Sequence, residues 1–210
     1  LPFFGKKGVV TGNPVRNEFF DVPPKKRADE SHILIFGGSQ GARAINTAMV
    51  EALPHLAGFE EKLTITHQTG EADFENVKGA YSASQFALAD VRPFISDIFV
   101  EFGRSDLIIC RAGATTCAEV SAAGKAAIMV PLPTAADDHQ RKNAEALVKA
   151  GAARMILQSE LTGESLANSI KELIAAPEEI TEMESAARKL GRPDAASVTV
   201  DIIEQLKSSV

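Results

Sequence analysis

Residues 33–42 read ILIFGGSQGA, four apolar residues followed by a glycine-rich turn, and a helical pattern over residues 42–56 comes next. Glycines let a backbone turn tightly and bring its N–H groups close to a ligand, and the start of a helix adds a partial positive charge that suits a phosphate. The stretch therefore predicts a buried strand that leads into a helix. The turn between them either binds a phosphate or is simply tight, without a ligand.

The same alternation of strand and helix continues along the chain. We expect strands at residues 33–36, 63–67, 86–91, 107–110, 127–130 and 154–157. We expect helices between them at residues 42–56, 71–81, 97–102, 116–123 and 139–149. Such repeats predict a parallel sheet that is covered on both faces. The expected fold class is a doubly wound, Rossmann-like α/β domain, with three further helical stretches at the end of the chain.

The chain divides into three expected parts. Residues 1–30 carry Pro2, Pro14, Pro23 and Pro24 and no sustained period, so we interpret them as an interdomain connecting segment. Residues 31–192 would form the sheet domain, and residues 193–210 a C-terminal helix. The first residue is Leu1 and no signal-peptide pattern follows it, which suggests a piece of a longer protein.

Composition excludes several classes of function. The chain has 22 basic and 28 acidic residues, a net charge of −6, so its surface has no general attraction for nucleic acid. The one basic cluster, Lys25-Lys26-Arg27, is interpreted as a solvated linker. Cys110 and Cys117 are too few for a disulfide framework or a four-ligand zinc site, and free, buried thiols in a reducing cytoplasm are expected. No apolar run approaches the roughly 20 residues of a membrane-spanning helix.

A second glycine-containing junction follows the strand at residues 107–110. Small residues over 111–118 open a helix directly behind a buried strand, which is again the geometry of an anion site. Glu119 has two interpretations. Its carboxylate accepts hydrogen bonds from the vicinal hydroxyls of a sugar, or it forms a capping box with Thr116, three residues earlier.

A third junction follows the strand at residues 127–130. Asp137 could cap the next helix, with Gln140 at the third helical position. Alternatively, Gln140 and Asn143 lie on one helix face, and two neighbouring amides suit the recognition of neutral sugar hydroxyls. Both interpretations remain open.

Three such junctions on one sheet edge predict a nucleotide-diphosphate or nucleotide-sugar site. A nicotinamide site is disfavoured, because Ser39 replaces the second glycine of its motif and the second strand ends in His67-Gln68, where an acidic residue is expected. The sequence contains no Asp-x-Asp triplet for a metal–diphosphate clamp and no i, i+4 histidine pair, so we expect no metal site and no cofactor. It offers binding groups without a clear nucleophile or general base.

Several motifs in order resemble the C-terminal half of the MurG family of bacterial peptidoglycan N-acetylglucosaminyltransferases. They are GNPVR at residues 12–16, GGSQGAR at 37–43, CRAGAT at 110–115, Gln140 with Asn143, and KAGAA at 149–153. The resemblance runs from about Gly12 to the end of the chain. One departure is Ala112, where some relatives carry serine, which removes a hydroxyl contact and leaves the backbone donors.

The resemblance implies a GT-B enzyme, with two Rossmann-like domains and the active site between them. Such enzymes transfer GlcNAc from UDP-GlcNAc to the C4 hydroxyl of undecaprenyl-diphosphate-MurNAc-pentapeptide, converting lipid I to lipid II, with inversion and without a metal. They act at the cytoplasmic face of the bacterial inner membrane. The general base, the lipid I site and the principal peripheral membrane contact would belong to the N-terminal domain, which is not in this chain, and the C-terminal helix would pack toward that domain. We therefore expect this chain alone to be inactive.

The resemblance also implies a set of residues that bind UDP-GlcNAc. Ser39 and the turn at Ala114, Thr115 and Thr116 would hold the diphosphate, and Glu119 the ribose. The backbone of Ile95 would read uracil and Gln140 would contact the GlcNAc hydroxyls. The set is completed by Arg16 on the nucleotide side of the cleft, by Cys117 and Ala118 beside the diphosphate turn, and by Asn143 beside Gln140.

Two other functions remain as alternatives. The first is another UDP-sugar enzyme of GT-B fold, such as a UDP-GlcNAc 2-epimerase. The second is a stand-alone UDP-sugar-binding subunit that works with a membrane partner. The GGSQGA and GNPVR motifs favour the peptidoglycan transferase over the epimerase.

Overall fold

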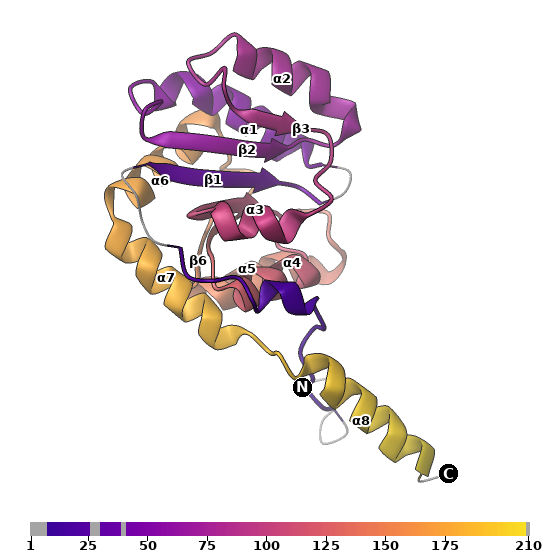
Figure 1. Ribbon diagram of the computed structural model, residues 1–210. Coiled ribbons are helices and arrows are strands. Elements are labelled where there is room, and N and C mark those ends of the chain that lie inside the picture. The colour runs from indigo at the N-terminus through magenta and orange to yellow at the C-terminus, as the bar shows by residue number, and fades with distance from the viewer. Residues whose placement is uncertain (1–7, 26–29, 39–40, 209–210) are drawn as a thin grey trace.

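The computed structural model describes residues 8–25, 30–38 and 41–208 and shows one parallel sheet between two layers of helices (Figure 1). The six strands run in the order β3-β2-β1-β4-β5-β6. This order confirms the doubly wound α/β fold. The strands are β1 (Ser31–Phe36), β2 (Leu63–Gln68), β3 (Asp90–Arg92), β4 (Leu107–Cys110), β5 (Ala126–Met129) and β6 (Ala153–Met155).

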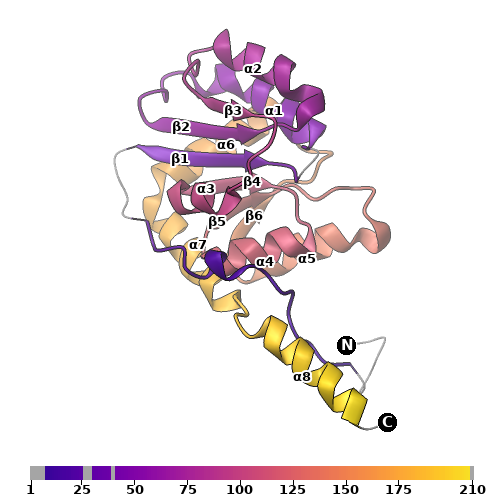
Figure 2. The same cartoon turned by 45° about the vertical axis from the view of Figure 1, so that its right-hand side comes forward.

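The helices divide between the two faces of the sheet. One face carries α1 (Arg43–Ala52), α2 (Phe74–Ser82) and α6 (Gly163–Ala175). The other carries α3 (Ile98–Arg104), α4 (Ala114–Ala123) and α5 (His139–Lys149). The long helix α7 (Pro177–Leu190) contributes side chains to both cores. The last helix, α8 (Ala195–Ser208), points away from the sheet (Figure 2).

Alternating side chains of the strands feed the two cores. Ile33 and Ile35 of β1 pack toward α1 and α6, whereas Leu34 and Phe36 pack toward α3 and α4. All four are buried, and burying one such side chain contributes about 1.5–3 kcal/mol. A strand that is buried on both faces has no polar alternation, which explains the continuous apolar run in the sequence.

Among the predicted elements, one helix and one strand are several residues shorter than the sequence pattern indicated. The helix expected over residues 42–56 ends at Ala52 and continues as a 3-10 turn, Leu53–Leu56, because Pro54 has no backbone N–H to donate. The strand expected over residues 86–91 is only Asp90–Arg92. Phe86 is buried in the core, but it sits in a turn that the Ser84 hydroxyl closes by accepting the Phe86 N–H. An apolar run at this place therefore marked core packing and not a strand.

The connecting segment also contributes to the core. A 3-10 turn, Asn17–Phe19, buries Phe19 completely, edge-on to Phe102 with ring centroids 5.0 Å apart. Lys25 forms an ion pair with the buried carboxylate of Asp106, so the prediction of a solvated linker is wrong at this residue. Lys26 and Arg27 lie outside the described residues. Within the described ranges, no helix has both the length and the apolar character that a bilayer crossing requires.

Candidate functional site

The candidate site lies where the strand order reverses, between β1 and β4. From β1 the chain builds the sheet outward through β2 and β3, and from β4 it builds in the opposite direction. Phe36 pairs with Cys110, and Cys110 pairs with Met129, so the three predicted junctions leave the sheet at the same level. The expectation that they share one edge is confirmed. In a doubly wound sheet, this crevice beyond the carboxyl ends of the strands is where ligands bind.

The glycine turn after β1 is pressed against the loop after β2. Gly38 and Gly41 have φ angles of +89° and +75°, and a Cβ atom on Gly41 would lie 1.8 Å from the Thr69 carbonyl oxygen. The Gly41 N–H closes the turn on the Gly38 carbonyl at 2.9 Å. Only glycine allows this approach without displacing the backbone. Ser39, the predicted diphosphate contact in this turn, lies outside the described residues.

A buried polar chain supports the glycine turn from behind. Asn46 of α1 donates to the Thr69 carbonyl at 2.9 Å, and its oxygen lies 3.1 Å from Nε2 of His67. Nδ1 of His67 lies 3.2 Å from the Tyr81 hydroxyl. Because the Asn46 oxygen can only accept, Nε2 of His67 carries a proton, and burial keeps the ring neutral by lowering its pKa, so Nδ1 accepts the Tyr81 hydroxyl. Asn46 was not among the predicted residues, although a polar side chain on the apolar face of an amphipathic helix signals a buried partner.

Burial of His67 predicts that the fold is sensitive to acid. Burial lowers the pKa of His67 to about 3 from its ordinary 6.5. Below pH 6.5, His67 of the unfolded chain therefore binds a proton, whereas His67 of the folded chain stays unprotonated. The free energy of unfolding falls as the pH falls from 6.5 toward 3. By pH 5 this amounts to about 2 kcal/mol of unfolding free energy. Urea unfolding at a series of pH values should show this loss in the wild type and a flatter profile in His67→Gln, and parallel profiles would contradict the assignment.

The start of α4 presents free backbone donors at the crevice. The helix begins at Ala114, its N-cap is Gly113, and no side chain caps it. The N–H groups of the first helical residues have no partner inside a helix, so those of Ala114, Thr115 and Thr116 face the direction from which an anion would approach. The Cys117 N–H instead donates to the Gly113 carbonyl at 2.9 Å. The thiol of Cys117 is buried, and burial raises its pKa to about 12.

The capping-box interpretation of Glu119 is wrong. Because α4 begins two residues earlier than predicted, Thr116 is the third helical residue and Glu119 the sixth, too far along the helix to cap it. Glu119 is half-buried, and burial raises the pKa of its carboxyl group, an effect that the positive charge of Arg16 partly offsets. The carboxylate, on the second turn of α4, is therefore left to serve another partner.

The GNPVR segment lies along α4 although it is about 100 residues away in sequence. Asn13 Nδ2 is 3.3 Å from the Thr115 hydroxyl, and Gly12 packs against Arg192 and Ala195. This placement brings the exposed guanidinium of Arg16 near Glu119. The Arg16 guanidinium carbon stacks 5.3 Å from the Phe19 ring centroid and 5.6 Å from that of Phe99. The structure thus unites two residues that the resemblance placed on the nucleotide side.

Gln140 and Asn143 hold the neighbouring loops in place. Asn143 Nδ2 donates to the Ala112 carbonyl at 3.0 Å, and Gln140 Oε1 accepts the Leu132 N–H at 3.0 Å. The predicted cap by Asp137 is wrong: α5 begins at His139, Asp137 and Asp138 have left-handed backbones, and no side chain caps the helix. Because Gln140 uses its oxygen within the protein, the group that it can offer a sugar is its amide nitrogen.

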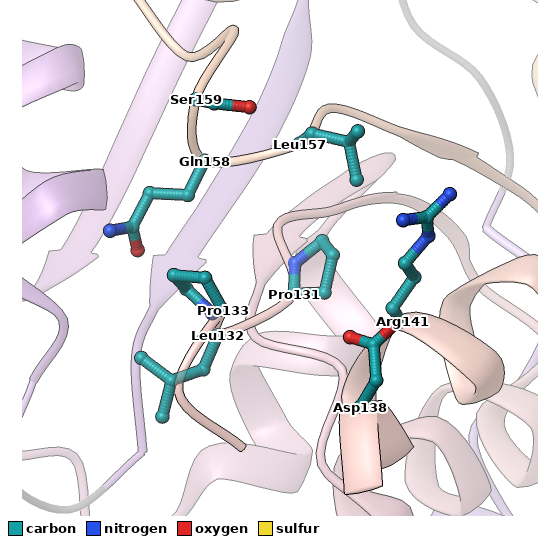
Figure 3. A pocket seen from close by; sticks show the side chains of 8 residues that line it. All are labelled: Pro131, Leu132, Pro133, Asp138, Arg141, Leu157, Gln158 and Ser159. Carbon is teal, nitrogen blue, oxygen red and sulfur yellow. The ribbon is translucent and has the colours of Figure 1, made fainter. Parts of the chain in front are cut away.

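A cavity of about 450 Å³ lies beside these loops (Figure 3). It opens between the loops after β5 and β6, at the end of the sheet away from the switch point between β1 and β4. Arg111 connects this cavity to the α4 junction: its guanidinium donates to the Val130 carbonyl at 3.1 Å and to Gln158 Oε1 at 2.7 Å. The cavity is lined by Pro131, Leu132, Pro133, Asp138, Arg141, Leu157, Gln158 and Ser159.

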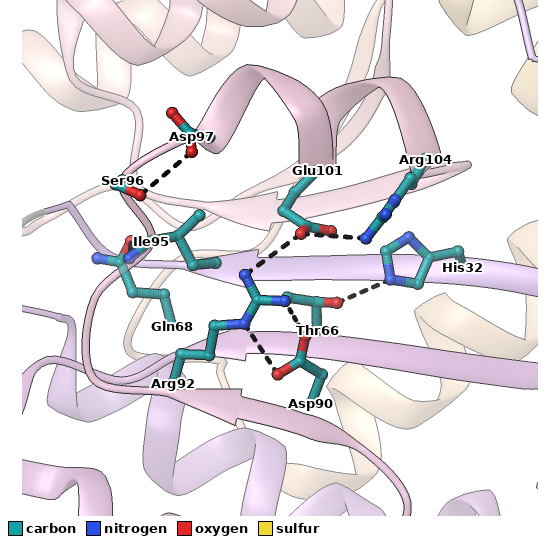
Figure 4. A network of polar contacts seen from close by, with 10 residues as sticks. All are labelled: His32, Thr66, Gln68, Asp90, Arg92, Ile95, Ser96, Asp97, Glu101 and Arg104. Atoms are coloured by element: carbon teal, nitrogen blue, oxygen red, sulfur yellow. Dashed lines mark hydrogen bonds and ion pairs between the residues drawn. The ribbon is translucent and has the colours of Figure 1, made fainter.

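Ile95 lies in the segment that joins β3 to α3. Its side chain is only 4% exposed, so any contact with a base falls to its backbone. The Ile95 N–H lies 3.3 Å from Gln68 Oε1, and the two residues stand next to each other in Figure 4. The described residues contain no group of three or more histidine, cysteine or acidic side chains that could hold a metal ion.

Sequence comparison agrees with this geometry. Residues 32–199 match the glycosyltransferase family 28 C-terminal domain. The chain belongs to this family. The family 28 match covers the whole sheet from β1 onward and ends within α8, so it includes all three junctions.

Relatives of known name extend the family 28 assignment. The chain is 54% identical over 198 residues to a Geotalea uraniireducens protein. That protein is named UDP-N-acetylglucosamine–N-acetylmuramyl-(pentapeptide) pyrophosphoryl-undecaprenol N-acetylglucosamine transferase. The alignment covers 92% of this chain and 54% of the relative. The chain therefore spans about half the length of the curated relatives it matches. It is also similar to the crystal structure of Acinetobacter baumannii MurG, with 41% identity, a TM-score of 0.76, and coverage of 85% of this chain and 51% of that one.

A more distant neighbour shows the fold alone. A UDP-N-acetylglucosamine 2-epimerase structure from Listeria monocytogenes, described as putative in its own name, aligns with a TM-score of 0.61 at 15% identity. The alignment covers 95% of this chain and 51% of the neighbour. Both kinds of enzyme share this α/β architecture, so the architecture does not separate the two functions. The sequence identities do favour the family 28 transferases.

Proposed function

We propose that this chain is the donor-binding half of an inverting glycosyltransferase that moves GlcNAc from UDP-GlcNAc to lipid I, giving lipid II. One observation carries the proposal: the uncapped start of α4, with Glu119 one turn inside it, opens at the switch point of a family 28 domain. The Geotalea uraniireducens relative bears the name of this transferase. In the proposed division of the chain, residues 1–30 connect two domains, residues 31–192 bind the donor, and residues 193–210 face the other domain.

The start of α4 suits the diphosphate of the donor. Negative charge builds on the UDP leaving group as the bond to the sugar breaks. The N–H groups of Ala114, Thr115 and Thr116 and the positive end of the helix dipole would stabilise that charge from fixed positions. Because these donors are already in place in the structure, they need no reorganisation during the reaction. This arrangement supports diphosphate binding without a metal ion.

The groups around α4 suit the remainder of the donor. Glu119 would accept hydrogen bonds from the two ribose hydroxyls, and Arg16 would lie on the nucleotide side. The Ile95 backbone would contact uracil, and the Gln140 amide nitrogen would donate to a GlcNAc hydroxyl, with Asn143 fixing the α4 junction behind it. Ser39 is proposed from the resemblance alone.

The remaining chemistry is proposed for the other half of the enzyme. We assign the general base, the lipid I site and the peripheral contact with the cytoplasmic face of the inner membrane to the part of the relatives that this chain does not cover. Accordingly, the chain alone should bind UDP-GlcNAc and transfer nothing.

A substitution at Gln140 tests the sugar contact. Gln140→Ala should leave the affinity for UDP within about twofold, but it should reduce the preference for UDP-GlcNAc over UDP by about 5–10-fold, the cost of one or more lost hydrogen bonds. Calorimetry with both ligands measures the two affinities. An equal loss for both ligands would show that Gln140 only holds the loop at Leu132.

Ligand selectivity tests the proposed function as a whole. Calorimetric titration of the chain should show binding of UDP-GlcNAc, weaker binding of UDP-glucose and no binding of NAD, with no change on addition of EDTA. Incubation with UDP-GlcNAc should yield no epimerised sugar nucleotide by NMR. Binding of NAD, or epimerisation of UDP-GlcNAc, would replace this proposal with another function of the same fold.

A further inference from the structure

Gln68 connects the two segments that meet the nucleotide at its two ends. It is the last residue of β2 and is only 4% exposed. Its Nε2 donates to the Gly38 carbonyl at 2.8 Å, and its Oε1 accepts the Ile95 N–H at 3.3 Å. One amide therefore joins the glycine turn after β1 to the segment between β3 and α3, and Figure 4 shows its side chain alongside Ile95.

Both contacts require a side chain that carries one donor and one acceptor, as an amide does. Gly38 offers a carbonyl oxygen, which requires a donor, and Ile95 offers an N–H, which requires an acceptor. A glutamine side chain carries one group of each kind. A glutamate carboxylate would keep the contact with Ile95 but would place a negative oxygen against the Gly38 carbonyl. A methionine of the same length would make neither hydrogen bond.

Backbone contacts hold each of these segments, and Gln68 adds a direct side-chain link between them. Gly41 closes the glycine turn on itself by donating to the Gly38 carbonyl at 2.9 Å, and a Cβ on Gly38 would meet nothing within 4 Å. On the other side, the Gly70 N–H donates to the Pro93 carbonyl at 3.0 Å, which fixes the segment two residues before Ile95. Within the part of the chain that the structure describes, Gln68 is the one side chain that hydrogen-bonds to both segments.

We infer that Gln68 is a positioning residue that sets the distance between the nucleobase segment at Ile95 and Gly38, at the carboxyl end of β1 beside the crevice that would hold the diphosphate. The inference rests on the proposed function, because it takes a uridine diphosphate as the ligand. The base and the diphosphate of one nucleotide are joined through its ribose, so they reach their sites together only when the spacing of those sites lies within the reach of the ligand. Gln68 thus acts on affinity through Ile95 and Gly38, without contacting the ligand.

The test compares Gln68→Glu with Gln68→Met in the full 210-residue chain, using UDP as the calorimetric probe. At about pH 8 both variants should bind UDP about tenfold or more weakly than the wild type, the cost of losing a buried hydrogen bond. A protonated carboxyl group has one donor and one acceptor, like the amide it replaces. At a pH below the pKa of the introduced carboxyl group, which NMR titration of the variant measures, Gln68→Glu should recover to within about threefold of the wild type at the same pH, and Gln68→Met should not.

A glutamine at the other edge of the sheet provides the control. Gln85 donates to the Leu53 carbonyl at the opposite edge of the sheet, so Gln85→Met should bind UDP like the wild type. The inference is overturned if both Gln68 variants bind UDP as tightly as the wild type, or if the Gln68→Glu variant fails to recover at the lower pH. If the wild type itself does not bind UDP, the proposed function fails instead. Should Gln68→Met not fold, the pH profile of Gln68→Glu still decides.

Discussion

Replacing Glu119 by alanine should reduce the affinity for UDP by about 5–150-fold, with little change in melting temperature. The range corresponds to about 1–3 kcal/mol, the usual cost of losing hydrogen bonds to a charged group. The carboxylate is half-buried one turn inside α4, and no capping role accounts for its position. Because two vicinal hydroxyls can each donate to one carboxylate, the ribose of a nucleotide is the natural partner.

A deoxyribose ligand separates this role of Glu119 from a structural one. The wild type should bind 2′-deoxy-UDP more weakly than UDP. Glu119→Ala should lose this discrimination, because it lacks the carboxylate that accepts a hydrogen bond from the 2′ hydroxyl. Isothermal calorimetry gives the affinities, and differential scanning calorimetry gives the melting temperature. A lower melting temperature with intact affinity and intact discrimination would assign Glu119 to the fold alone.

Replacing Gly41 by alanine should destabilise the fold by about 3 kcal/mol or more and abolish measurable UDP binding. A left-handed backbone costs a residue with a Cβ about 1–2 kcal/mol. The clash with the Thr69 carbonyl, 1.8 Å from the added atom, comes on top of that cost, because a backbone oxygen cannot rotate away. For a domain of this size the melting temperature should fall by about 6–12 °C. Moving the glycine turn would also displace Gly38 and its contact with Gln68.

Gly58 provides a matched control for Gly41. Its φ angle is +85°, almost the same as the +75° of Gly41, but a Cβ on Gly58 would meet nothing within 4 Å. Gly58→Ala should therefore show the backbone cost alone and retain UDP binding. Thermal unfolding and UDP titration of the two variants measure the difference. Equal losses of stability in both variants would mean that the contact between the glycine turn and Thr69 is unimportant.

The sequence predicted the fold well where packing follows a local period. The strand at residues 107–110 and the helix at residues 139–149 have the bounds that were expected. Errors arose where tertiary contacts override the local pattern. The apolar run around Phe86 enters the core through a turn. Phe19 of the connecting segment packs against Phe102, a contact between distant residues that no short-range pattern reveals.

The sequence predicted which loops form the candidate site better than how its side chains are used. The parallel arrangement of the strands follows from the alternation of elements, so the three junctions could be placed on one edge in advance. The two capping assignments failed because each depends on the first residue of a helix, which sequence locates to within a few residues. Asn46, Gln68 and Arg111 were missed as supports, since their partners are backbone groups of loops far away in sequence.

A crystal structure of this chain with UDP-GlcNAc, grown in the presence of EDTA, would show directly how the donor is held. The diphosphate should lie within hydrogen-bonding distance of the N–H groups of Ala114, Thr115 and Thr116, the ribose hydroxyls on Glu119 and uracil at Ile95, with no cation between protein and ligand. A donor bound in the cavity between the β5 and β6 loops, or at the amino edge of the sheet, would contradict this expectation.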